Sequence, residues 1–271
     1  MNWEHPEISD AIRRALEEDI GAGDVTSEAC IPADAVSKGK FLAGEAMVVA
    51  GLELLLQIYK DVQVELIHSS GDRVDENAEL ARVEGNTRRL LALERTALNF
   101  VQRLSGIATL ARRFVDAVED TGCTILDTRK TTPGLRRLEK LAVAAGGAKN
   151  HRMGLYDAIL IKNNHIEAAG GVRQAFERAQ SKGLPIEIEV RSFEEIDEAL
   201  AAGVTHMLLD NFSPEEIREA VKRIGGRAKT EVSGGVKLET VRAYAECGVD
   251  YCSAGALTHS ARAMDVKFRI A

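Results

Sequence analysis

The sequence predicts an α/β protein in which an N-terminal α+β domain is followed by an incomplete parallel α/β barrel. The main observation is a regular alternation of apolar runs and helical segments through the second half of the chain. Six short apolar runs lie roughly 20 to 35 residues apart, at residues 123–127, 158–162, 186–190, 206–210, 229–233 and 250–254. Most of them are followed by a helical segment with a glycine near its end, which is typical of a parallel sheet or barrel.

Six strand–helix units favour a barrel that is incomplete relative to the usual eight. The alternative is an open, doubly wound sheet, which has the same alternation along the chain. Both architectures bind ligands at the carboxyl ends of their parallel strands. Functional side chains are therefore expected directly after each apolar run.

The chain before residue 86 lacks this alternation, which indicates a separate α+β domain. Ile8, Ile12, Leu16 and Ile20 have helical spacing and predict a helix over residues 7–20. Strand-like pieces follow at residues 40–43, 46–50, 62–68 and 78–85, with a helical stretch around 53–60 and a turn at 71–74.

A long helical pattern then runs from near Asn86 to about Asp120, with one break expected at Ser105 and Gly106. Its apolar stripe consists of Leu90, Leu93, Ala97, Phe100, Val101 and Leu104. We expect this helix to carry the chain from one domain into the other.

The composition excludes several classes of protein. With 45% hydrophobic and 28% charged residues the chain is an ordinary globular protein, and a net charge of −7 with a pI of about 5.5 argues against nucleic-acid or membrane partners. Cys30, Cys123, Cys247 and Cys252 have no metal-ligand spacing, so we expect thiols in a reducing cytoplasm. The N-terminal segment does not resemble a signal peptide, and no apolar run is long enough for a membrane span.

Cationic side chains gather around the first two predicted barrel strands. They are Arg129, Lys130, His151, Arg152 and Lys162. Positive charges directed at one place repel each other unless an anion binds between them. The alternative is a solvated basic rim, but these charges lie at strand ends rather than along a helix face. The pattern therefore favours an anion site.

Acidic side chains lie within or after the later strands. Glu187 and Glu189 are two residues apart and share one face of a strand, and Asp210 ends the next one. A carboxylate inside a buried strand costs several kcal/mol unless it is paired or used. We expect cations of the barrel to pair with Glu187 and Glu231, and both interpretations stay open for Glu189.

Glycine-rich turns follow the last two predicted strands. Ser233–Gly235 and Ser253–Gly255 each precede a helix, where backbone N–H groups can approach an oxyanion closely. The loops after the last strands of such barrels are their usual phosphate site. His259 could support a phosphate or merely cap a helix. The predicted site at the strand ends therefore has a cationic part, an acidic part and a phosphate-binding part. The cationic part suits a diacid, and the acidic part suits a sugar on which positive charge develops.

Longer segments carry a family resemblance. They are residues 93–109, 127–165, 186–190, 208–212, 231–236 and 248–260. They strongly resemble quinolinate phosphoribosyltransferases, the decarboxylating nicotinate-nucleotide pyrophosphorylases of NAD biosynthesis. The resemblance implies an α/β sandwich domain over residues 1–106 and a barrel domain over 107–261, with residues of about 262–271 packing back on the first.

The resemblance also implies an activity and its residues. The reaction joins the quinolinate nitrogen to C1 of phosphoribosyl pyrophosphate, and loss of the 2-carboxylate then gives nicotinate mononucleotide. The substrate-binding positions are Arg95, Thr128, Arg129, Lys130, His151, Arg152, Lys162, Glu189, Asp210, Ser233, Gly234, Gly235, Gly255 and His259. Among them Lys130, Lys162, Glu189 and Asp210 are the implied catalytic residues.

Mg²⁺ is the implied cofactor, with Glu189 and Asp210 near it. The implied assembly is a homodimer in which the neighbouring subunit lends Arg95. Four alternatives remain: a ModD-like paralogue with a different pyridine or related acid, a nicotinate phosphoribosyltransferase, a Schiff-base aldolase using Lys162, and a non-catalytic sensor of anionic metabolites.

Overall fold

The computed structural model describes residues 1–270, and the chain divides into two compact units. The first unit comprises residues 1–112, residues 131–147 and the chain from residue 257 onward. The second unit comprises residues 113–130 and 148–256. The chain thus returns to the first unit twice.

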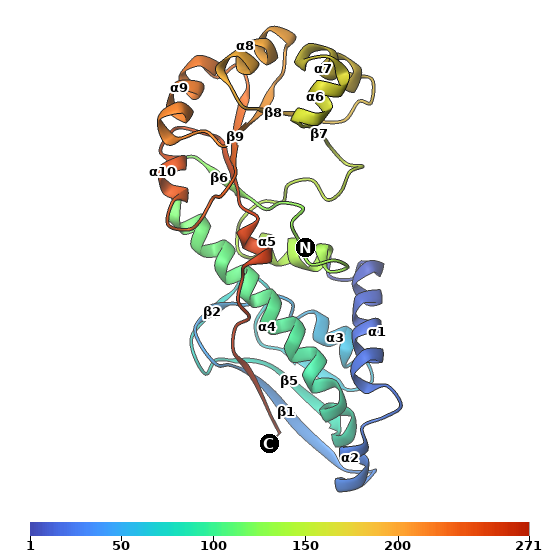
Figure 1. Cartoon of the computed structure of the whole chain (residues 1–271). Helices are drawn as coiled ribbons and strands as arrows, with labels where there is room; N and C mark the ends of the chain where they lie inside the picture. The colour runs from blue at the N-terminus through green and yellow to red at the C-terminus, as the bar shows by residue number, and fades with distance from the viewer. Residues whose placement is uncertain (271) are drawn as a thin grey trace. The chain divides into compact units, whose positions relative to one another are not determined.

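The first unit contains a four-stranded antiparallel sheet (Figure 1). Its strands, in spatial order, are β12 (Val266–Ile270), β1 (Val36–Ala43), β5 (Glu79–Asn86) and β3 (Gln63–Leu66). Phe41 of β1 pairs with Phe268 and Ala81, and the aromatic rings of Phe41 and Phe268 lie 5.0 Å apart. A short ribbon of β2 (Met47–Val48) and β4 (Arg73–Val74), and helices α1 (Pro6–Ile20), α2 (Val25–Cys30), α3 (Leu54–Ile58) and α5 (Arg136–Ala145), complete this unit. The sequence prediction of a helix over residues 7–20 is confirmed by α1.

The long helix α4 (Thr87–Ala117) is continuous, so the predicted break at Ser105 and Gly106 is wrong. The Ser105 hydroxyl is buried and bonds both backbone groups of Ala50, the N–H at 3.1 Å and the carbonyl at 3.4 Å. A Cβ at Gly106 would overlap the carbonyl oxygen of Arg262. These two small residues therefore allow other segments to approach the helix closely, and they do not end it.

The second unit is built on a six-stranded parallel sheet (Figure 1). Along the chain its strands are β6 (Thr124–Leu126), β7 (Ile159–Ile161), β8 (Ile186–Val190), β9 (His206–Asp210), β10 (Lys229–Ser233) and β11 (Tyr251–Ser253). All six match the apolar runs of the sequence to within one residue at each end.

The order of these strands in space is β6-β11-β10-β9-β8-β7, so the first strand pairs with the last. Every other neighbour follows chain order, which is a ring that is open only between β6 and β7. An open doubly wound sheet would instead reverse its strand order at a switch point. The incomplete barrel is therefore confirmed over the doubly wound alternative.

Helices follow most of the strands. They are α6 (Asn163–Ala169), α7 (Val172–Gln180), α8 (Phe193–Ala202), α9 (Pro214–Ile224), α10 (Val241–Ala245) and α11 (Ala256–His259). At α9, Ser213 and Glu216 form a reciprocal capping box, and Gly225 ends the helix in the left-handed conformation. None of the helices within residues 1–270 has the length and apolar character required to cross a bilayer.

Candidate active site

A pocket of about 250 Å³ lies at the carboxyl ends of the barrel strands, within the second unit. It is lined by predicted site residues from successive strand ends: Thr128, Arg129, Lys130, His151, Arg152, Lys162, Glu189, Asp210, Ser233 and Gly234. Leu160, Leu208, Glu231 and Ser253 also line it. The second unit thus brings together ten of the positions that the sequence singled out.

Two guanidinium groups define the cationic side of the pocket. Burial lowers the pKa of Arg152, and the positive charge of Arg129 lowers it further. Arg152 donates from Nη1 to the carbonyl oxygen of Ala158 at 3.0 Å, while its buried Nε has no hydrogen-bond partner within residues 1–270. Two neighbouring cations favour an incoming anion, and a guanidinium suits a carboxylate or phosphate.

The acidic side faces this cluster from β8 and β9. Glu189 is 7% exposed, and its Oε2 lies 2.8 Å from Nζ of Lys162. Burial raises the pKa of Asp210, and the nearby charge of Glu189 raises it further. Two carboxylates that repel each other across a pocket fit a cation between them, and their oxygen donors are of the kind that Mg²⁺ prefers.

Lys162 is held at the junction of β7 and α6. Its backbone is extended, and its N–H donates to Nδ1 of His165 at 2.9 Å at the start of the helix. Its side chain is half exposed and extends to Glu189. This geometry places one positive charge between the cationic and acidic sides of the pocket.

The turn after β10 provides the third part of the site. Gly234 and Gly235 have φ angles of +97° and +64°, which favour glycine, and a Cβ at Gly234 would lie 2.9 Å from Oδ1 of Asn211. Ser233, Gly234 and Ser253 line the pocket. Small residues here leave space for a ligand close to the backbone.

Four predicted positions are not among the residues that line the pocket. Gly235 and Gly255 follow lining residues in the chain at the turns after β10 and β11. Arg95 is exposed on α4 and His259 is exposed at the end of α11, and both belong to the first unit. Nδ1 of His259 is hydrogen-bonded with the Ser260 hydroxyl at 2.6 Å.

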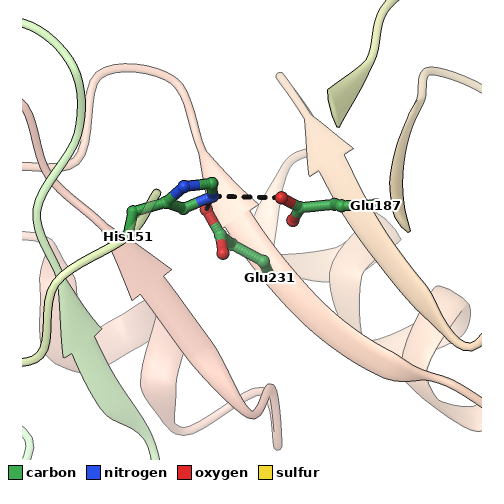
Figure 2. A group of neighbouring side chains, drawn as sticks. All are labelled: His151, Glu187 and Glu231. Carbon is green, nitrogen blue, oxygen red and sulfur yellow. Dashed lines mark hydrogen bonds and ion pairs between the residues drawn. The ribbon is translucent and has the colours of Figure 1, made fainter. Parts of the chain in front are cut away.

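Beneath the cationic side, Glu187 and Glu231 meet His151 (Figure 2). Oε2 of Glu187 lies 3.0 Å from Nε2 of His151, and Oε1 of Glu231 lies 3.7 Å from the same nitrogen. Burial, and then the charge of Glu187, raises the pKa of Glu231 to about 8. Of the cationic side chains expected to pair with these glutamates, His151 lies within ion-pair distance of both, and His206 lies within that distance of both as well.

Sequence reasoning missed His206, whose Nε2 lies 3.5 Å from Oε1 of Glu187. It begins β9, where it pairs with Lys229 of β10, and a histidine at the start of an apolar run gives no sequence signal of these contacts. Burial lowers the pKa of His206.

Comparisons with known proteins match the whole length of the chain. The family model "Quinolinate phosphoribosyl transferase, N-terminal domain" matches residues 24–105, and the corresponding C-terminal domain model matches residues 107–269. A quinolinate phosphoribosyltransferase (decarboxylating) of Nicotiana tabacum is 42% identical over 98% of this chain and 83% of its own length. A probable nicotinate-nucleotide pyrophosphorylase (carboxylating) of Bacillus subtilis is 41% identical over 98% of this chain and 94% of its own. The solved structure of NadC from Streptococcus pyogenes superimposes with a TM-score of 0.93 at 38% identity, over 98% of this chain and 96% of that one.

Proposed function

The chain belongs to the quinolinate phosphoribosyl transferase family, and on this premise we propose that its pocket makes nicotinate mononucleotide for NAD biosynthesis. The enzyme transfers phosphoribosyl from phosphoribosyl pyrophosphate to quinolinate and releases pyrophosphate and CO₂. The observation that carries this proposal is one pocket with mutually repelling cations on one side and mutually repelling carboxylates on the other.

The cationic side binds quinolinate. Its two adjacent carboxylates require two positive clamps, and Arg129, Lys130 and Arg152 supply them at the end of the barrel. A guanidinium can bind a carboxylate through two parallel hydrogen bonds, which fixes the plane of the pyridine ring. The bound anion also offsets the electrostatic repulsion between Arg129 and Arg152, and this contributes to the affinity for the substrate.

The acidic side stabilises the ribosyl group. As the bond from C1 to pyrophosphate breaks, positive charge develops at the sugar, and Glu189 and Asp210 offer negative charge and acceptors for the ribose hydroxyls. Lys162, next to Glu189, carries positive charge towards the leaving pyrophosphate. Mg²⁺ held near Glu189 and Asp210 would neutralise charge on the pyrophosphate.

The turns after β10 and β11 hold the 5′-phosphate. Ser233, Gly234 and Gly235 provide close backbone approach after β10. Gly255 and His259 are further positions that the family resemblance implies for phosphate binding. A phosphate fixed at one end and a diacid fixed at the other orient C1 towards the ring nitrogen.

Decarboxylation follows from the product of the transfer itself. Once the nitrogen is ribosylated, the pyridinium accepts the electron pair left at C2 when the bond to the 2-carboxylate breaks, and C2 then takes a proton. The protein only has to hold the ring, so no organic cofactor is required.

The active assembly is a homodimer in which each subunit lends Arg95 to its partner's site. An exposed arginine on α4 supports this, since an unburied guanidinium is available to a second chain. We also place the enzyme in the cytoplasm, which the four free thiols support. The Nicotiana tabacum relative is named mitochondrial.

The deciding experiment is a steady-state assay with phosphoribosyl pyrophosphate and Mg²⁺ that follows pyrophosphate release with either acid and CO₂ release from quinolinate. Turnover is expected with quinolinate, with none from nicotinate and none after chelation of the metal. Turnover of nicotinate without quinolinate, or tight quinolinate binding without pyrophosphate release, contradicts the proposal.

A further inference from the structure

His151 lines the substrate pocket. Its ring meets two buried carboxylates, Glu187 and Glu231 (Figure 2). We call Glu187 and Glu231 the acid pair; they come from β8 and β10, and His151 comes from the loop before β7. His151 and Glu231 also line a second cavity of about 300 Å³, which the amino ends of the barrel strands surround. The acid pair and the imidazole therefore lie between two solvent-sized spaces.

The two ring nitrogens of His151 face different partners. The backbone N–H of Arg152 donates to Nδ1 at 2.7 Å, so Nδ1 has a lone pair there and no proton. Nε2 lies 3.0 Å from Oε2 of Glu187, an oxygen that can accept a hydrogen bond from a ring N–H. The single proton of the ring is then on Nε2. A doubly protonated ring would direct Nδ1–H against the Arg152 N–H.

Both members of the acid pair are held inside the barrel. Glu231 is fully buried, and its Oε1 lies 3.7 Å from Nε2 of His151. Oε1 of Glu187 is likewise buried, and Nε2 of His206 lies 3.5 Å from it. The two carboxyl groups therefore fix the position of the His151 ring from the side away from Arg152.

We propose that Glu187 and Glu231 are positioning residues that hold His151 as a neutral imidazole with its proton on Nε2. Glu187 is the acceptor for Nε2 of His151, Glu231 packs against the same nitrogen, and Nδ1 of His151 anchors the backbone of Arg152. His151 then contacts the substrate as an uncharged wall of the pocket. The positive charge that binds the diacid comes from Arg129, Lys130 and Arg152 alone.

A bound divalent cation is the competing explanation, because donor atoms of His151, Glu187 and Glu231 all lie within 4.8 Å of one another. A metal on Nε2 requires the ring proton to be on Nδ1, opposite the N–H of Arg152. The observed hydrogen bond favours a proton over a metal in this cluster.

The tautomer is tested directly by ¹⁵N NMR of the enzyme labelled at its histidines, with His151→Gln identifying the signal by its loss. The expected spectrum shows an unprotonated Nδ1 and a protonated Nε2 for His151 near neutral pH. A protonated Nδ1, with Nε2 unprotonated or also protonated, overturns the proposal. This measurement does not depend on which reaction the enzyme catalyses.

The positioning effect is tested by comparing Glu187→Ala with Glu187→Gln, and this arm rests on the proposed function. Loss of the acceptor in Glu187→Ala should raise the KM for quinolinate about tenfold, corresponding to one hydrogen bond, with a smaller change in kcat. Glu187→Gln should recover most of this loss and keep the tautomer, because its carbonyl oxygen still accepts from His151. Glu198→Ala, an exposed glutamate of α8, is the matched control and should change neither parameter.

A glutamine cannot replace a carboxylate as a metal ligand, so the two explanations separate. If Glu187→Gln is as impaired as Glu187→Ala, or stoichiometric metal is found in the dialysed wild type and lost in both variants, the positioning proposal fails. Should Glu187→Ala not fold, the spectrum of Glu187→Gln still decides: loss of the Nε2 proton contradicts the proposal. A wild type without quinolinate turnover refutes the proposed function and leaves the tautomer result standing.

Discussion

At the scale of single residues, like charges lie close together in the pocket, so that a ligand of opposite charge reduces the repulsion between them. Arg152 shows this most clearly, since its guanidinium is partly buried, lies near Arg129 and retains one unpartnered donor. Arg152→Ala should therefore weaken quinolinate binding by one to two orders of magnitude, corresponding to a charge-assisted hydrogen bond. Calorimetric titration with quinolinate measures this. Arg223→Ala, which removes an exposed arginine of α9, is the control, and unchanged affinity in Arg152→Ala would remove this residue from the clamp.

Glu231 makes a prediction about stability. Its pKa is raised from 4.5 to about 8 in the folded chain, so the folded state keeps a proton that the unfolded state releases as the pH rises. The stabilisation linked to this proton is complete below about pH 4.5 and is lost as the pH rises to about 8.

Glu231→Gln cannot titrate, so the wild type should lose stability relative to this variant between pH 5 and pH 8, by an amount on the order of a few kcal/mol. Urea unfolding of both proteins at the two pH values gives the difference. Glu198→Gln serves as the exposed control. Parallel pH curves for wild type and Glu231→Gln would show that the carboxyl is already ionised in the fold.

The sequence predicts the polar residues of the pocket better than it predicts their partners. Arg129, Lys162 and Asp210 are predictable because they lie at or just after the ends of apolar runs, and strand ends meet at one edge of a parallel sheet. The contact of His151 with Glu187 could not be predicted, because it joins a loop to a strand across the barrel. Alternation along a strand gives the face of a side chain and not its neighbour on another strand.

At the scale of elements, local patterns succeed where the element is regular and fail where the tertiary structure decides. All six barrel strands follow from short apolar runs. In contrast, α5 comes between β6 and β7 in the chain yet belongs to the first unit, and nothing in its amphipathic pattern indicates this. The false break in α4 has the same origin, since Gly106 is required by the nearby carbonyl of Arg262 and not by the helix.

Gly106→Ala tests this interpretation of α4. Alanine has a higher helix propensity than glycine by about 1 kcal/mol, so a helix without neighbours would gain stability. Here the new Cβ overlaps the Arg262 carbonyl oxygen, and a backbone atom cannot move aside cheaply. We expect a net loss of about 1–3 kcal/mol, seen as a lower Tm in thermal unfolding. Arg113→Ala, an exposed change in the same helix, should be nearly neutral, and a higher Tm for Gly106→Ala would contradict the interpretation.

At the scale of the whole molecule, the net charge of −7 argues against nucleic-acid or anionic-membrane partners, although one pocket is locally cationic. The fold class and family were predictable because the alternating pattern and the motif segments both extend over long stretches of the chain. The division into units was not, since residues 131–147 return to the first unit by contacts distant in sequence. Assembly is a property that only an experiment on two chains can test.

A mixing experiment with two inactive variants provides that test. Lys162 lines the pocket of its own chain, whereas Arg95 is proposed to serve the partner's pocket. Arg95→Ala and Lys162→Ala homodimers should therefore each be nearly inactive. In a mixed dimer, the chain with Arg95→Ala keeps its Lys162 and receives an intact Arg95 from its partner, so one of the two sites is complete. Random reassociation of equal amounts should restore roughly a quarter of the wild-type activity per chain, as a two-fold interface requires.

The control mixes Lys162→Ala with Glu189→Ala, which damage the same pocket and cannot complement. If the first mixture recovers no more activity than this control, Arg95 acts within its own chain or not at all, and the shared site is refuted while the pocket of the second unit stands.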